Sequence, residues 1–286
     1  MRKDIILPAL ALVGGAAGFI LRLWQYSSAY DPATELFAHN APASLVLVAW
    51  VLLLGVLALV LGRGGTAAEQ PEESFLCPGT GYMTVMTAGG MCFLAAAAVG
   101  VPELLLQYQA WQIDPKHNIL PVAFLLSVLF CLLGAVGALV SGRNNYRGIT
   151  GLQTRAPAAM PAYAALPWLM ALYQEDSRDP VLIRVFVPLL AAVFLLLALY
   201  QQAAFFYRRS HPVRFLFFAV MGIALGLTSL ADRPGLFQIV STLAFVLCTL
   251  GGLIAFTRNR FGPPWPKRVQ QDGPRMPQPE PGITEE

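Results

Sequence analysis

Residues 157–173 read PAAMPAYAALPWLMALY, an apolar stretch that contains Pro157, Pro161 and Pro167. The stretch is short for a membrane helix, and its prolines also fit a kinked span, a re-entrant segment or an interfacial helix. Whether it crosses a membrane decides the layout of the whole chain. If it crosses, the two ends of the chain lie on the same side; if it does not, everything downstream is inverted.

Seven longer apolar runs surround this stretch. Each is close to the roughly 20 residues that a helix needs to cross about 30 Å of hydrocarbon. The chain of 286 residues is 56% hydrophobic and only 12% charged, whereas soluble domains carry roughly 25% charged residues. These features predict an all-α integral membrane protein. The seven runs are 5–23, 43–62, 83–106, 119–141, 181–206, 213–231 and 236–257.

The distribution of lysine and arginine decides between seven and eight crossings, because these residues are retained on the cytoplasmic side. If 157–173 crosses, 14 of the 19 basic residues lie inside; if it does not, the division is 9 inside to 10 outside. The sequence therefore predicts a polytopic bundle of eight transmembrane helices, with both termini in the cytoplasm. The five outer basic residues are then Arg22, Lys116, Arg178, Arg184 and Arg233.

The connectors on the predicted outer side share an Asp-Pro pattern. Asp31-Pro32, Asp114-Pro115 and Asp179-Pro180 each precede a rising apolar run, and Asp232-Arg233-Pro234 is a looser case. Aspartate suits a helix N-cap and proline suits the first helical position. We therefore expect four helical hairpins, each turned on the outer side. The repetition fits either a duplicated unit, as in many transporters, or the common use of Asp-Pro to start helices.

The last part of the chain differs in character. Residues 262–286 contain seven prolines and few large apolar side chains, so this segment cannot bury a core. We expect two regions, a helical bundle at 1–261 and a disordered, proline-rich cytoplasmic tail at 262–286 that a membrane or cytoplasmic protein partner could bind. The remaining expected partner is the lipid bilayer.

The usual signatures of catalysis and cofactor binding do not occur in the sequence. There is no phosphate-binding glycine loop, no Cys-x-x-Cys pair, and no second metal ligand at helical spacing from His39, His117 or His211. Glu72-Glu73 is interpreted as surface charge in a solvated connector. We therefore predict no catalytic residues, no cofactor, no metal and no nucleic-acid partner, and we do not expect an enzyme.

Three charged residues lie about one turn inside the predicted outer ends of helices: Arg22, Glu103 and Arg184. Each shares a helix face with small residues, for example Gly18 and Gly15 below Arg22, and such faces are where membrane helices meet. The charges should therefore point into the bundle, where they are costly and often functional.

This pattern predicts an outer polar pocket of two arginines and one glutamate, with aromatic walls from Trp24, Tyr108 and Trp111. Arginine favours a carboxylate or phosphate, so an anionic solute or a lipid headgroup is expected. The alternative is a structural ion pair with one arginine extending to the interface and the aromatic residues in the interfacial belt.

The glycine pairs Gly14/Gly18 and Gly222/Gly226 predict close helix packing within the bundle rather than dimerisation. The functional hypothesis is a transporter or permease-like bundle for a small solute or lipid in the plasma membrane. The alternative is a non-catalytic accessory or sensory membrane protein that acts through helix contacts and its tail. A resemblance to a known family is not evident in the residues.

Overall fold

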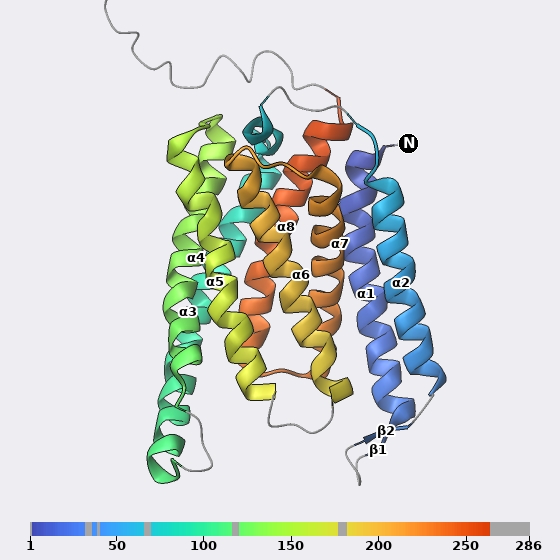
Figure 1. The fold of residues 1–286 in the computed structure, drawn as a ribbon, viewed down its shortest axis with the longest axis vertical. Helices are drawn as coiled ribbons and strands as arrows, with labels where there is room; N and C mark the ends of the chain where they lie inside the picture. Colours follow the sequence, from blue (N-terminus) through green and yellow to red (C-terminus); the bar gives the residue numbers. More distant parts are fainter. Residues whose placement is uncertain are drawn as a thin grey trace, which may run out of the picture.

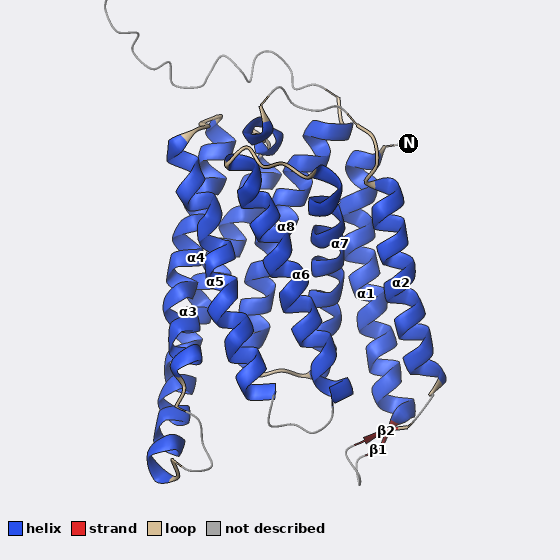
Figure 2. Cartoon of the chain, in the orientation of Figure 1, coloured by secondary structure: helices blue, strands red, loops and turns tan. Residues whose placement is uncertain are grey.

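The computed structural model describes residues 2–31, 36–38, 41–65, 70–115, 120–176 and 182–263, excluding the side chains of 36, 175, 176 and 182–185. Within these ranges almost every segment is helical, and the two strands pair through Tyr30 and Phe37 (Figure 2). The elements are α1 (Lys3–Ala29), β1 (Tyr30–Asp31), β2 (Leu36–Phe37), α2 (Pro42–Leu61), the 3₁₀ turn η1 (Pro71–Phe75), α3 (Thr80–Ile113), α4 (Val122–Arg147), α5 (Leu152–Asp176), α6 (Leu182–Phe206), α7 (Pro212–Ser229), the 3₁₀ turn η2 (Leu230–Asp232) and α8 (Leu236–Phe261).

The helices run up and down in one bundle, and the start of α1 and the end of α8 lie at the same end (Figure 1). We call this the termini end, and we call the opposite end, where α1 meets α2 through β1 and β2, the hairpin end. The last helix, α8, occupies the centre, because it packs against α1, α3, α5, α6 and α7. In the most apolar 18-residue stretch of α8, 72% of the residues are buried, against 22% in that of the peripheral α2.

Among the helices of the described residues, seven are long and apolar enough to cross a membrane, namely all except α5. Helix α5 contains the doubtful stretch 157–173. It forms a single helix of 25 residues, which corresponds to about 37 Å, and it runs beside α4 and α6 from one end of the bundle to the other (Figure 1). Helix α3 is longer still, with 34 residues, and extends beyond its neighbours at the hairpin end.

Two of the three prolines of α5, Pro157 and Pro161, are accommodated by contacts with α4. Proline removes one backbone donor and so frees the carbonyl four residues earlier. The carbonyl that Pro157 frees, that of Gln153, accepts a hydrogen bond from Asn144 Nδ2 at 3.3 Å. Pro161 frees the carbonyl of Pro157. This carbonyl lies against Gly137 of α4, because a Cβ added to Gly137 would come within 2.8 Å of the Pro157 oxygen. A glycine on α4 therefore allows the irregular face of α5 to approach closely.

The predicted glycine pairs lie at helix contacts inside the bundle, as expected. A Cβ on Gly14 would lie 2.8 Å from Leu54 of α2, and one on Gly18 would overlap the Thr228 hydroxyl of α7. At Gly222 the obstacle is the backbone of α6, with the Leu195 nitrogen 3.0 Å away. These positions set the spacing of α1, α2, α6 and α7, because a side chain there would force the helices apart.

The predicted Asp-Pro helix starts are wrong wherever the structure describes them. Asp31 lies in β1, and Asp114 follows the last residue of α3, where its amide donates to the Ala110 carbonyl. The next helices begin later, at Pro42 and Val122. Asp232 lies in η2, before α8 begins at Leu236. The residues that precede these three helices are Ala41, Pro121 and Gly235, so aspartate does not cap the next helix. Asp179-Pro180 lies outside the described residues.

Candidate functional site

Arg22 is the centre of a closed polar cluster at the hairpin end. Its guanidinium is buried, with 1% of the side chain exposed, and its Nε donates to Asp232 Oδ1 at 2.7 Å. Its Nη1 donates to Gln25 Oε1 at 2.6 Å, and Gln25 in turn donates to Ser44 Oγ of α2. Arg22 therefore ties α1 to the turn between α7 and α8 and, through Gln25, to α2.

Two aromatic rings cover this cluster. The Arg22 guanidinium lies 5.0 Å from the ring centre of Tyr26 and 5.5 Å from that of Phe37, the residue of β2 that packs over the end of α1. Both distances are within the range of cation–π attraction. The small residues below Arg22, including Ala11, Gly15 and Gly18, are buried as their helical spacing predicts.

The other predicted site residues are distributed along the hairpin end. Glu103 of α3 approaches the same α7–α8 turn, because its Oε1 would lie 3.6 Å from a Cβ on Gly235. The structure thus brings Arg22 and Glu103 to one connector, where Arg22 forms an ion pair with Asp232. The side chain of Arg184, near the start of α6, lies outside the described residues.

The predicted aromatic walls lie on the surface. Trp24 is 44% exposed, and Tyr108 and Trp111 stack on each other on α3 with ring centres 5.8 Å apart. The positions of all three residues suit the interfacial belt of a membrane protein.

A second polar feature lies inside the bundle, on one face of α8. Phe245, Thr249, Gly252 and Phe256 follow one another at spacings of four, three and four residues, so they share one helix face. Trp168 of α5 stacks on Phe245 with ring centres 4.5 Å apart. The Gln202 amide of α6 lies against Gly252, and a Cβ there would come within 2.7 Å of Gln202 Cδ. We call Trp168, Gln202 and Thr249 the inner polar track.

Each member of the inner polar track is buried and carries a polar atom without a hydrogen-bond partner among the described residues. The atoms are Trp168 Nε1, Gln202 Oε1 and Thr249 Oγ1, and their side chains belong to residues that are 2%, 6% and 0% exposed. Leaving a buried polar group unpaired costs about 1–3 kcal/mol. Three such atoms along the inner polar track are therefore costly unless water or a solute bonds to them.

The turn η1 covers the termini end of the inner polar track. Phe75 is fully buried, with its ring among those of Phe205, Phe206, Phe215 and Phe256 at centre distances of 5.3–5.6 Å. The prediction that Glu72 is surface charge is wrong, because its side chain is 3% exposed and accepts hydrogen bonds from the Gly151 amide at 2.8 Å and from Arg155.

In the connector after η1, Cys77 is also buried. The Cys77 amide donates to the Asn145 carbonyl of α4, and burial raises the pKa of the Cys77 thiol.

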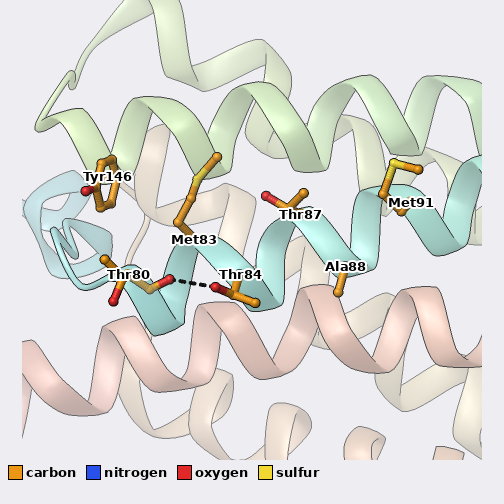
Figure 3. A pocket seen from close by; sticks show the side chains of 7 residues that line it. All are labelled: Thr80, Met83, Thr84, Thr87, Ala88, Met91 and Tyr146. Carbon is orange, nitrogen blue, oxygen red and sulfur yellow. Dashed lines mark hydrogen bonds between the residues drawn. The ribbon is translucent and has the colours of Figure 1, made fainter.

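A shallow groove on the surface of α3 is mostly apolar. Figure 3 shows the hydroxyl of Thr84 donating to the Thr80 carbonyl, so this hydroxyl is already engaged. The side chains come from one face of α3, with Tyr146 added from α4, and present methyl, thioether and hydroxyl groups to the outside. The groove is lined by Thr80, Met83, Thr84, Thr87, Ala88, Met91 and Tyr146.

The inner polar track and the buried η1 were not found from the sequence. A tryptophan, a glutamine and a threonine on three different helices have no common spacing, so nothing local connects them. For η1 a signal existed, because Phe75, Leu76 and Cys77 are apolar residues in an otherwise polar connector. Among the described residues, no three His, Cys, Asp or Glu side chains gather as metal ligands would.

Comparison of the chain with protein-family models, with curated proteins and with solved structures finds no match.

Proposed function

We propose that this chain is a multi-pass protein of the plasma membrane with both termini in the cytoplasm, and that it is a permease-like bundle for a small, uncharged, hydrogen-bonding solute. The termini end then faces the cytoplasm, because arginine and lysine gather there. In this arrangement α5 is the eighth crossing, and its irregular backbone is acceptable because α4 and α6 flank it.

The observation that carries this proposal is the inner polar track. In lipid the bundle interior has no bulk water to satisfy polar side chains, so unpaired groups there mark a path or a site rather than packing. The track offers a donor at Trp168 Nε1, an acceptor at Gln202 Oε1 and a hydroxyl at Thr249 that can do both.

The track also bears on the charge of the solute. Its three side chains are neutral, which favours a neutral solute over the anion that the arginines suggest in the sequence. The Arg22 guanidinium is already engaged by the Asp232 carboxylate.

The test uses purified protein in liposomes and measures the uptake of radiolabelled urea and glycerol, with acetate as the charged comparison. Thr249→Val removes a hydroxyl of the track and should reduce uptake about tenfold, the equivalent of one hydrogen bond of about 1.4 kcal/mol. Thr257→Val is the matched control on the same helix, because the Thr257 hydroxyl already donates to the Leu253 carbonyl at 2.8 Å.

We expect Thr257→Val to leave uptake per folded molecule unchanged. The proposal fails if urea and glycerol enter no faster than into protein-free liposomes, or if both threonine variants reduce uptake equally.

A further inference from the structure

We propose that residues 71–75 form a plug that closes the inner polar track at the termini end and leaves its seat to admit solute. This inference rests on the proposed function, because it concerns access to the same track. It assigns a role to η1, a buried turn that lies between the long helices α2 and α3.

The seat of the plug lies at the end of the track. Phe256 continues the α8 face that carries Thr249 and Gly252, and it lies 5.6 Å from Phe75 between ring centres. On α6, Phe205 and Phe206 lie one turn beyond Gln202 and also contact Phe75. The ring of Phe75 therefore covers the track from the side that faces the cytoplasm in the proposed orientation.

Polar contacts on two sides hold the plug in place. The Glu72 carboxylate bonds to the Gly151 amide and to Arg155, both at the start of α5. From α8, Asn259 Nδ2 approaches the Ser74 and Leu76 carbonyls at 2.9 and 2.7 Å. These contacts can break without unwinding a helix, because η1 is one short turn between connectors. We therefore regard Glu72 as the latch of the plug.

The experiment measures access to the track directly and needs no knowledge of the solute. All four native cysteines are replaced by alanine, Thr249→Cys is introduced, and inside-out membrane vesicles are treated with a charged, membrane-impermeant methanethiosulfonate. The rate of modification at position 249 is compared with Phe75 present and with Phe75→Ala. We expect Phe75→Ala to raise this rate by at least about tenfold, because the rate follows the population in which the track is open.

Two further variants separate a plug from general loosening of the bundle. Glu72→Gln keeps Phe75 but weakens the latch, so it should also raise the rate, and it is the milder change if Phe75→Ala misfolds. Phe124→Ala is the matched control, because Phe124 is a buried phenylalanine at the hairpin end, where it packs on Phe237 at 4.7 Å between ring centres. It should leave the rate unchanged.

The outcomes distinguish the two proposals. Equal modification of position 249 with and without Phe75 means that the track is reached but Phe75 does not control it, which overturns the plug and leaves the proposed function intact. No modification in any variant means that the track is closed to water from this side, which overturns both. A rate increase in Phe124→Ala as large as in Phe75→Ala means non-specific loosening and overturns the plug.

Discussion

Replacing Asp232 by asparagine should destabilise the protein, although asparagine has nearly the same shape. The change keeps an oxygen that can accept the 2.7 Å hydrogen bond from Arg22 Nε, but it removes the negative charge. The Arg22 side chain is 1% exposed and that of Asp232 6%, so a buried guanidinium would lose the negative charge that the Asp232 carboxylate supplies.

The size of the effect follows from the burial of the pair. Removing one partner of a buried ion pair costs about 3–5 kcal/mol. The hydrogen bond to Gln25 and the rings of Tyr26 and Phe37 remain in place, so we expect the lower end of this range for Asp232→Asn. A loss of about 3 kcal/mol lowers the equilibrium constant for folding by more than a hundredfold. Asp232→Ala, which also removes the acceptor, should lie at the upper end.

The measurement is the free energy of unfolding in lipid bicelles by steric trapping. The double variant Arg22→Met/Asp232→Leu should be far more stable than the sum of the single losses predicts, because removing both charges leaves none unpaired. Arg233→Gln neutralises an exposed charge on the same turn and should change stability by less than about 0.5 kcal/mol. The reasoning is refuted if Asp232→Asn is as stable as the native protein, or if the double variant shows simple additivity.

Three further predictions concern packing, thiol reactivity and topology. Gly222→Ala should cost about 1–3 kcal/mol, because a Cβ would press on the Leu195 backbone, whereas Gly81→Ala has nothing within 4 Å and should be harmless; equal thermal stability of the two variants would contradict this. Because burial raises the pKa of the Cys77 thiol, less thiolate forms at a given pH, so maleimide should label it more slowly at pH 8 in the native protein than after unfolding in SDS, and equal rates would count against its burial. An alkaline phosphatase reporter should be active in the 177–181 connector and inactive at 207–211, and the reverse pattern would show that α5 does not cross the membrane.

Patterns of neighbouring residues on one helix predicted much of the structure. The buried face of α1, from Ala11 through Gly18 to Arg22, follows directly from helical spacing. The seven long apolar helices follow from hydropathy. The ends of the helices were less predictable. Helix α3 continues to Ile113 through a polar final part that includes Gln107 and Gln109. A polar helical turn forms the same backbone hydrogen bonds as an apolar one, so hydropathy does not show where the helix ends.

Contacts between distant parts of the chain could not be predicted. The partner of Arg22 lies 210 residues away, and no spacing rule connects the two. Glu72 looks like surface charge because its neighbours in sequence are polar, but the next phenylalanine carries the whole turn into the bundle. The inner polar track is undetectable for the same reason, since its three members come to lie along one face of α8 only once α5, α6 and α8 have packed.

The central place of α8 has a consequence for biogenesis. The ribosome makes α8 after α1 to α7, yet it is the helix around which α1, α3, α5, α6 and α7 are arranged. In the proposed membrane topology the earlier helices enter the bilayer before α8, so their inward faces must either close loosely on one another or remain covered by lipid or an insertion factor. A nascent chain whose synthesis is arrested before Leu236 would therefore lack its central helix. Its partial bundle of α1 to α7 should be open to proteolysis.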